Sequence, residues 1–284
     1  MQRIDKDRDS GSSAAPRRAV KSPHPSLLAL EPMRASMEFL ASVGVGPLLR
    51  CLPRGDGHPV LVLSAFGASD AATRPLRRRL RSIGYFAYGS KTGRMTGETG
   101  TLDRIAARLL EITAKHGAPV SIIGWSLGGM YARELARSHR ASVRQLILLG
   151  SPFRFRAHLG DRSLLSSLLG PAKIAKLELG DLRLDEHQRP AIDVPVTCIY
   201  SRTDGIVSWP ACAESQGPRR ENIEITGSHL GMTNNPAALI AIVDRLAQPV
   251  GHWKKFASPP AISWLYPTPR YWTAGLREGR PAVN

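Results

Sequence analysis

Residues 119–128, Pro-Val-Ser-Ile-Ile-Gly-Trp-Ser-Leu-Gly, carry the strongest structural signal in this chain of 284 residues. Four of the first five are apolar and three are β-branched, which predicts a buried strand. Residues 127–140 have apolar and charged side chains at helical spacing, which predicts a helix. Ser126 therefore stands in a sharp turn between a strand and a helix. Such a turn needs small residues two positions before and after the serine, and these are Gly124 and Gly128.

This turn presents the Ser126 hydroxyl at the positive N-terminal end of the helix. A G-x-S-x-G pentapeptide is weak evidence when it stands alone, and its simpler interpretation is a glycine-rich turn whose serine caps the helix. To act as a nucleophile, the serine needs a base that takes its proton and an acid that orients the base.

Two residues downstream of Ser126 stand where such partners are expected. Asp204 follows the apolar run 194–200, and His229 follows the alternating run 221–226, and both runs predict strands. Because the carboxyl ends of parallel strands meet at one edge of a sheet, we expect the three side chains to lie together there.

Competing residues are weaker candidates for these two roles. Of the eight histidines, only His229 stands between a predicted strand and the predicted final helix, 236–248. The loop after the predicted strand 143–149 is the main rival place for the acid, and its residues 151–156 include no carboxylate. An aspartate in a turn is usually only a turn former, but this absence favours Asp204.

Over residues 59–248 the chain resembles a bacterial member of the α/β-hydrolase superfamily, of the esterase/lipase type. The likeness rests on four motifs in order: a first core strand at 59–63 with its loop, the Gly-Trp-Ser-Leu-Gly-Gly turn, an aspartate after the penultimate strand and a histidine after the last. The resemblance implies an α/β fold, with a mostly parallel central sheet of about six strands flanked by helices and a small helical cap.

The resemblance also implies an activity, namely a serine hydrolase that cleaves a small-molecule carboxylic ester with an apolar moiety. Ser126 would attack the carbonyl, His229 would take the serine proton, and Asp204 would hold the tautomer of the histidine. Backbone N–H groups of Phe66 and Leu127 would form the oxyanion hole. Water would release the acyl group, and no metal or organic cofactor is expected.

One motif departs from the pattern of the superfamily. Similar proteins usually place His-Gly or Pro-Gly before the oxyanion residue, whereas this chain has Ser64-Ala65. If that glycine serves to reach positive φ, Ala65 is strained there. Other functions stay open: an acyltransferase using the same triad, a non-catalytic binding protein with the same fold, and a nucleic-acid-binding protein.

The formal net charge is +16, which is compatible with attraction to nucleic acid or to anionic lipid headgroups. The basic residues are spread widely without a nucleic-acid motif, so we expect no specific nucleic-acid partner. The three cysteines, Cys51, Cys198 and Cys212, imply no disulfide framework. Because the N-terminus lacks the apolar core of a signal peptide, we expect a cytoplasmic protein. The sequence does not define its oligomeric state.

We expect one domain at 26–249, between a disordered N-terminal tail at 1–25 and a tail rich in proline and aromatic residues at 250–284. Leucines at 161–179, within an insertion at about 153–192, are typical either of a cap or of ordinary helices covering one face of the sheet. The aromatic residues of the C-terminal tail either pack onto the domain or form a patch that contacts a lipid surface.

Overall fold

The computed structural model describes residues 23–44, 53–154 and 189–267. Most of the predicted N-terminal tail, most of the predicted cap insertion and the end of the C-terminal tail therefore lie outside the described residues. Within the described part, no helix is both long enough and apolar enough to cross a membrane.

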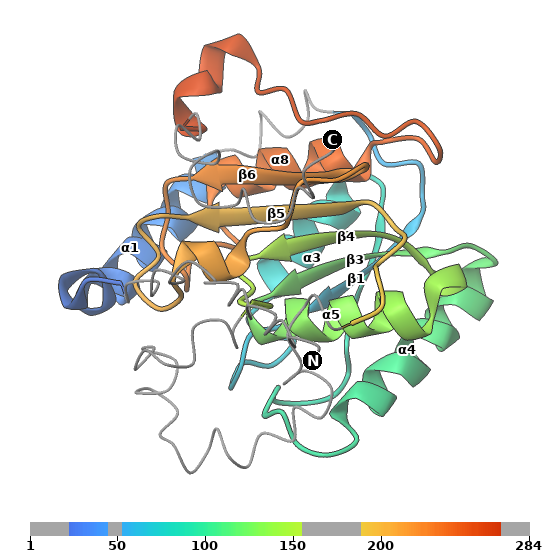
Figure 1. Cartoon of the computed structure of the whole chain (residues 1–284). Coiled ribbons are helices and arrows are strands. Elements are labelled where there is room, and N and C mark those ends of the chain that lie inside the picture. Colours follow the sequence, from blue (N-terminus) through green and yellow to red (C-terminus); the bar gives the residue numbers. More distant parts are fainter. Residues whose placement is uncertain (1–22, 45–52, 155–188, 268–284) are drawn as a thin grey trace, which may run out of the picture.

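Within the described residues, six strands form one sheet in the order β2-β1-β3-β4-β5-β6, and every neighbouring pair is parallel (Figure 1). The predicted α/β fold with a parallel central sheet is confirmed. The strands are short, mostly buried runs, as expected of a parallel sheet that is covered on both faces: β1 (Pro59–Leu63), β2 (Phe86–Gly89), β3 (Val120–Trp125), β4 (Val143–Leu149), β5 (Val196–Ser201) and β6 (Arg220–Ile225).

Helices cover both faces of this sheet (Figure 1). Val60 and Val62 join a core with α3 and α8, whereas Leu61 and Leu63 join a second core with α4 and α5. Each face buries its own core because successive side chains of a strand alternate between the two sides. The helices are α3 (Arg74–Ser82), α4 (Thr101–His116), α5 (Leu127–Ser138) and α8 (Pro236–Leu246).

A further helix, α1 (Pro25–Gly44), precedes the sheet in sequence and lies beside the carboxyl ends of β5 and β6 (Figure 1). Two of its side chains, those of Glu31 and Ser42, are fully buried. Its outer side exposes the apolar residues Leu30, Met33, Met37, Phe39, Leu40 and Val43. The two buried side chains make polar contacts: Glu31 accepts from backbone N–H groups of the loops that carry the site, and Ser42 accepts from Arg79 of α3.

The described part of the C-terminal tail packs against the α8 side of the sheet. The Tyr266 hydroxyl donates to the Ala237 carbonyl oxygen at 2.9 Å, and the rings of Phe256 and Tyr266 meet edge to face at 4.8 Å. The prediction that aromatic residues of this tail pack onto the domain is confirmed for these two, whereas Trp264 is 77% exposed. Short 3-10 helices complete the described elements: η1 (Arg140–Ser142), η5 (Trp209–Cys212) and η6 (Pro260–Leu265).

Some boundaries differ from the predicted ones for local reasons. Strand β5 begins at Val196 and not at residue 194, because Pro195 has no N–H to donate to a neighbouring strand. Helix α5 ends at Ser138, since the next residue, His139, has φ −128° and ψ 47°, outside the helical region.

The expectation of backbone strain at Ala65 is wrong. Ala65 is not among the described residues with positive φ, and the loop after β1 reaches positive φ at Gly67, with φ 71°. Glycine adopts this conformation without steric cost. The left-handed position of the loop is thus occupied by a glycine two residues further on, and Ala65 packs into the core at 7% exposure.

Candidate active site

Ser126 occupies the turn between β3 and α5 in a strained backbone conformation. Its φ is 53° and its ψ is −119°, which for a residue other than glycine costs on the order of 1–3 kcal/mol. The surrounding backbone holds this conformation, because the Ser126 N–H donates to the Leu149 carbonyl oxygen at 2.9 Å and the Ser126 carbonyl oxygen accepts from the Gly129 N–H at 3.0 Å. The serine side chain is thereby set at the N-terminal end of α5.

Both glycines of the motif are required by close approach of the backbone. A Cβ atom at position 124 would lie 2.3 Å from the Gly129 Cα, and one at position 128 would lie 2.7 Å from the Leu63 carbonyl oxygen. These distances are far below a normal contact, so Gly124 and Gly128 let α5 pass directly over β3 and β1. The prediction of small residues on either side of the serine agrees with this packing.

Asp204 and His229 meet at the carboxyl edge of the sheet. His229 Nδ1 and Asp204 Oδ2 are hydrogen-bonded at 2.6 Å, and the two residues are each 3% exposed. The other oxygen of Asp204 accepts the backbone N–H groups of Ile206 and Val207 at 2.8 and 2.7 Å. The carboxylate is therefore fixed in orientation, with one oxygen left to the imidazole.

The serine turn and this Asp–His pair lie against each other. The Trp125 indole N–H donates to the His229 carbonyl oxygen at 3.0 Å. Gly150 directly follows Leu149, whose carbonyl oxygen accepts the Ser126 N–H. A Cβ atom at position 150 would lie 3.1 Å from His229 Nδ1. No hydrogen bond joins Ser126 Oγ to His229 within the described residues. Such bonds are often long without substrate.

The electrostatic surroundings of His229 favour its protonated form. Burial by itself lowers the pKa of His229, but the charge and hydrogen bond of Asp204, together with the charge of Glu31, raise the pKa above its usual value. With Nδ1 bonded to Asp204, the imidazole can exchange a proton through Nε2. The pair has the arrangement of a general base and its orienting acid.

The predicted oxyanion-hole residues lie on the two expected loops. Leu127 is the first residue of α5, whose N–H has no acceptor within the helix, and Phe66 stands in the loop after β1. Neither N–H donates to a protein acceptor in the part of the chain that the structure describes. Hydrogen bonds of Gly67 and Ala68, to Met95 O and Ala65 O, hold the Phe66 loop in place.

Sequence reasoning missed the residues that α1 contributes to this site. Glu31, Arg34 and Glu38 contact the loops of Asp204 and His229. Their spacing puts these charged side chains on one face of a largely apolar helix, and this was the only signal in the sequence.

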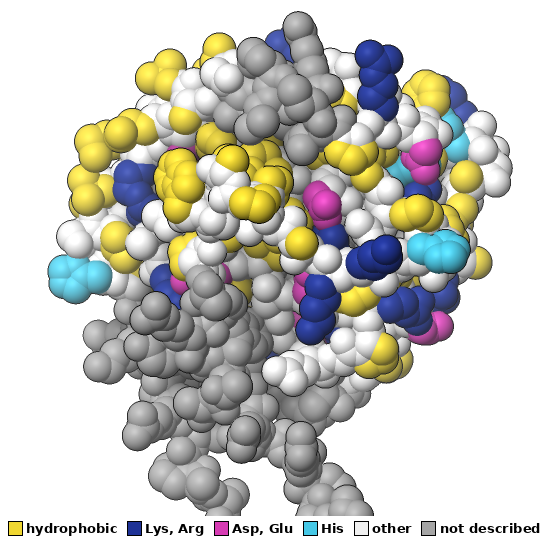
Figure 2. Space-filling view, turned by 90° about the horizontal axis from the view of Figure 1, so that it is seen from above, with side chains coloured by type: hydrophobic (Ala, Val, Ile, Leu, Met, Phe, Trp, Pro, Cys, Tyr) yellow, Lys and Arg dark blue, Asp and Glu magenta, His cyan; other side chains and the backbone are white. Residues whose placement is uncertain are grey.

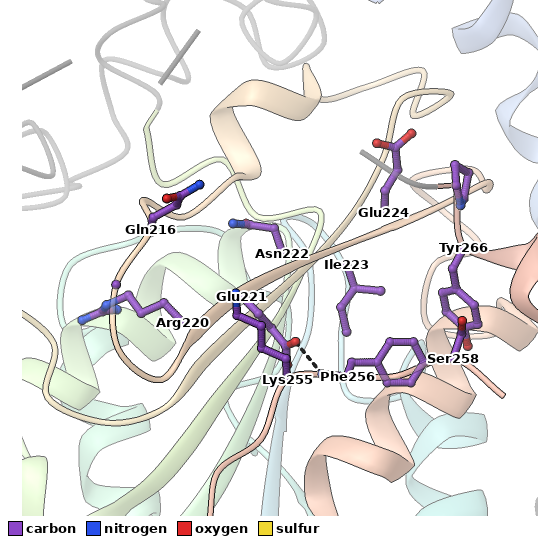
Figure 3. A pocket seen from close by; sticks show the side chains of 12 residues that line it. Gln216, Arg220, Glu221, Asn222, Ile223, Glu224, Lys255, Phe256, Ser258 and Tyr266 are labelled. Atoms are coloured by element: carbon purple, nitrogen blue, oxygen red, sulfur yellow. Dashed lines mark hydrogen bonds between the residues drawn. The ribbon is translucent and has the colours of Figure 1, made fainter. Parts of the chain in front are cut away.

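One well-defined cavity lies away from this site. A cavity of about 620 Å³ lies along the outer edge of β6, between that strand and the segment around Phe256 and Tyr266, and none of the candidate catalytic residues lines it (Figure 3). The Phe256 N–H donates to the Glu221 carboxylate there at 2.8 Å. Among the described residues, no group of three or more His, Cys, Asp or Glu side chains is placed to hold a metal ion.

The positive charge of the chain is not gathered into one band on the face seen in Figure 2. Lys and Arg side chains stand there at several separate places, interspersed with hydrophobic and acidic side chains. A nucleic-acid backbone needs a continuous basic stripe or patch. The basic side chains that this view shows among the described residues therefore form no continuous stripe.

Comparisons with known proteins agree with this fold. No model of a known protein family matches the chain. An alignment over 123 residues, which covers 40% of the chain, is 27% identical to the pimeloyl-[acyl-carrier protein] methyl ester esterase of Aliivibrio salmonicida, strain LFI1238. The match spans 44% of that curated relative, less than half of its length.

Two solved structures share the architecture. A metagenome-derived lipolytic enzyme superposes with a TM-score of 0.51 at 16% identity, over 68% of this chain and 93% of its own. Lipase B of Aspergillus fumigatus superposes with a TM-score of 0.50 at 20% identity, over 69% of this chain and 53% of its own. These likenesses show that the chain has the α/β-hydrolase fold.

Proposed function

We propose that the protein is a serine hydrolase that cleaves carboxylic esters, with Ser126 as nucleophile, His229 as general base and Asp204 as orienting acid. The observation that carries this proposal is the buried 2.6 Å hydrogen bond between Asp204 and His229, packed against the strained turn of Ser126. A structural serine cap needs neither the strain nor the buried acid–base pair.

The reaction proceeds in two steps through an acyl-enzyme. His229 takes the Ser126 proton while Oγ forms a bond to the ester carbonyl carbon, and the resulting imidazolium is stabilised by the Asp204 carboxylate. The imidazolium then gives the proton to the leaving alkoxide, so that the alcohol departs and the acyl group remains on Ser126. In the second step, His229 deprotonates a water molecule, whose oxygen attacks the acyl carbon. The imidazolium then returns the proton to Ser126 Oγ as the bond to the acyl carbon breaks, which releases the acid and restores the serine.

The negative charge of each tetrahedral intermediate falls on the former carbonyl oxygen. The N–H groups of Leu127 and Phe66 are the donors that we assign to it, since both are free of protein acceptors within the described residues and belong to the loops that flank Ser126. The positive end of the α5 dipole adds to this stabilisation.

An ester with an apolar acyl or alcohol part is the substrate class that we assign. The curated relative is named for cleaving a methyl ester, and the structural relatives are a lipolytic enzyme and a lipase. These likenesses support ester chemistry in this chain, and they do not distinguish one ester from another. An acyltransferase would use the same three residues with an alcohol in place of water.

The test is hydrolysis of nitrophenyl esters of increasing acyl length by the full chain and by Ser126→Ala. Loss of the nucleophile should lower kcat by about 10⁴-fold or more while leaving the circular dichroism spectrum unchanged. Ser138→Ala, an exposed serine at the other end of α5, is the matched control and should keep full activity. Near-parental turnover in Ser126→Ala would contradict the mechanism. Product analysis with added alcohol separates hydrolysis from acyl transfer.

A further inference from the structure

Helix α1 reaches both loops of the acid–base pair through one buried carboxylate. Glu31, which is 1% exposed, accepts the backbone N–H of Gly205 at 2.8 Å and that of His229 at 3.0 Å through Oε1, and that of Leu230 at 2.9 Å through Oε2. Gly205 directly follows Asp204. A single side chain therefore fixes the backbone beside the orienting acid and the backbone of the base itself.

Two neighbours of Glu31 extend this contact along the same helix. Arg34 donates to the carbonyl and hydroxyl oxygens of Thr203 at 2.6 and 2.8 Å, next to Asp204. Glu38 accepts the N–H and O–H of Ser228 at 2.6 and 2.9 Å, next to His229. Each catalytic loop is thus held at two points by α1.

The helix backbone also lies directly on these loops. A Cβ atom at position 205 would be 2.5 Å from the Leu27 carbonyl carbon, and one at position 231 would be 2.9 Å from the Ala35 Cα. Gly205 and Gly231 therefore permit a contact that any other residue would obstruct. This fit argues for a built interface, because a helix resting loosely on a surface would not require glycine on both loops.

We propose that α1 is the positioning element of the active site and that Glu31 is a positioning residue, which sets the loop of Asp204 and the loop of His229 relative to each other. The proposal rests on the function proposed above. The carboxylate offers two oxygens to three N–H donors, and charge-assisted hydrogen bonds of this kind are about twice as strong as neutral ones. Without it, three N–H groups, two of them in buried hydrogen bonds, lose their acceptor, and the two loops lose their common anchor.

The charge of Glu31 also acts on the base. The charged groups that face His229 are Asp204 from the β5 loop and Glu31 from α1. Arg34 lies 3.9 Å from the Glu31 carboxylate, and Glu38 binds Ser228, the residue before His229. The charge of Glu31 raises the pKa of His229. Removal of that charge should therefore lower the pKa of the imidazole, whereas a purely structural contact would leave it in place.

The experiment compares Glu31→Gln with Glu38→Gln in the full chain. Glutamine keeps the shape of Glu31, but one of its two terminal atoms is an NH₂ group. That group cannot accept a hydrogen bond and would place a second donor against a backbone N–H. We expect kcat to fall by about 10²-fold, the order expected for a displacement of about 1 Å in a catalytic site, with KM nearly unchanged. The acid limb of the kcat/KM profile should also move to lower pH.

Glu38→Gln is the matched control, because it is the same substitution two turns along the same helix and it leaves the Gly205 and His229 contacts in place. It should not move the acid limb. Glu111→Gln, whose side chain is 58% exposed on α4, controls for loss of one negative charge and should leave activity unchanged. If Glu31→Gln does not fold, as judged by urea unfolding, Glu31→Asp takes its place and should lose kcat with a smaller shift of the acid limb.

An NMR titration of the His229 imidazole makes the test independent of turnover. The signal is assigned by its absence in His229→Gln, and its pKa is measured in the parental chain and in Glu31→Gln. A lower pKa in Glu31→Gln supports the proposal even if the parental chain hydrolyses no ester, an outcome that would reject the proposed function alone. Unchanged kcat and unchanged imidazole pKa in a folded Glu31→Gln protein would overturn the positioning role and leave the proposed function standing.

Discussion

Ser126 shows how a single residue carries strain that its neighbours must support. A positive φ costs a serine on the order of 1–3 kcal/mol, yet hydrogen bonds to Leu149 and Gly129 hold that conformation. A chain that needed only a turn at this point would be more stable with glycine there. The retained serine is therefore best explained by its hydroxyl, which is what the proposed reaction uses.

The first residue-scale prediction concerns the orienting acid. In Asp204→Asn, the amide oxygen can still accept from Ile206 and Val207, but the amide nitrogen then faces His229 Nδ1. The imidazole must place its proton on Nε2, so it can no longer accept the serine proton, an effect of about 10⁴-fold in serine proteases. We expect a comparable loss of kcat here. Asp193→Asn, an exposed acid with 71% of its side chain accessible, is the control. Equal activities of the two variants would reject Asp204 as the acid.

The second residue-scale prediction concerns pH. His229 must be neutral to act as a base, and its pKa is raised because the charge and hydrogen bond of Asp204 and the charge of Glu31 outweigh the opposing effect of burial. Activity should therefore rise with pH through one ionisation centred above about pH 6.5, the usual value for histidine. The pH dependence of kcat/KM for a neutral ester measures it. An acid limb centred clearly below pH 6 would contradict the interpretation.

At the scale of elements, the site depends on how closely α5 crosses the sheet. Alanine at position 124 or 128 would be compatible with the apolar character of this contact. The backbones of α5, β3 and β1, however, lie too close together to leave room for its Cβ. The same crossing sets the Leu127 N–H beside the serine, so packing and chemistry share one geometry. The contact of α1 with the loops after β5 and β6 is the second such crossing, and there too glycines mark the approach.

The element-scale prediction is that Gly124→Ala is far more costly than its small size suggests. The added Cβ would stand 2.3 Å from the Gly129 Cα, so α5 must move away from β3. Overpacking of this kind costs about 1–3 kcal/mol or more, and the displaced turn should lower activity as well. Urea unfolding and ester hydrolysis measure both effects. Gly44→Ala, where a Cβ meets nothing within 4 Å, should be neutral. Parental stability and turnover in Gly124→Ala would show that the crossing is not tight.

At the scale of the whole molecule, buried ion pairs connect layers that the hydrophobic cores leave separate. Glu214, which follows η5, is 4% exposed and accepts from Arg133 of α5 at 2.6 Å. It also accepts from Arg220 of β6 at 3.4 Å. The pair therefore joins one helical layer to the last strand of the sheet.

The whole-molecule prediction is that Glu214→Gln destabilises the protein by about 3–5 kcal/mol, because it removes one partner of a buried ion pair. Burial by itself raises the pKa of Glu214, but Arg133 and Arg220 lower it below its usual value. A depressed pKa stabilises the fold above the unfolded pKa of about 4.3, and this contribution is lost as the pH falls through the folded pKa. The parental chain should therefore lose stability below about pH 4 more steeply than Glu214→Gln. Urea unfolding from pH 3 to 7 tests this, with the exposed Glu98→Gln as control. Parallel stability curves would show that the pair contributes nothing.

Several expectations of the sequence concern residues that the structure does not describe. The cap insertion at about 153–192 lies mostly among them, and its role over the site stays a prediction. Contact of the C-terminal tail with a lipid surface and the cytoplasmic location of the protein also stay predictions.

The sequence by itself determined the parallel sheet and the residues brought to its edge. Strand patterns are local, so the apolar runs predicted five of the six strands, all except β2 (Phe86–Gly89), and the resemblance to the α/β-hydrolase superfamily implied a mostly parallel sheet of about six. Loops after parallel strands necessarily meet at one edge, which is why the separation of Ser126, Asp204 and His229 along the chain did not hide them.

Only the tertiary structure decided how these residues are held. The Glu31 carboxylate binds backbone N–H groups 174 to 199 residues away, and every non-proline residue carries the same N–H group. No pattern in the sequence can therefore mark which donors a buried acid will meet. The conformation of Ala65 could not be predicted for a similar reason. The path of the whole loop after β1 determines which residue needs positive φ, and that residue is Gly67.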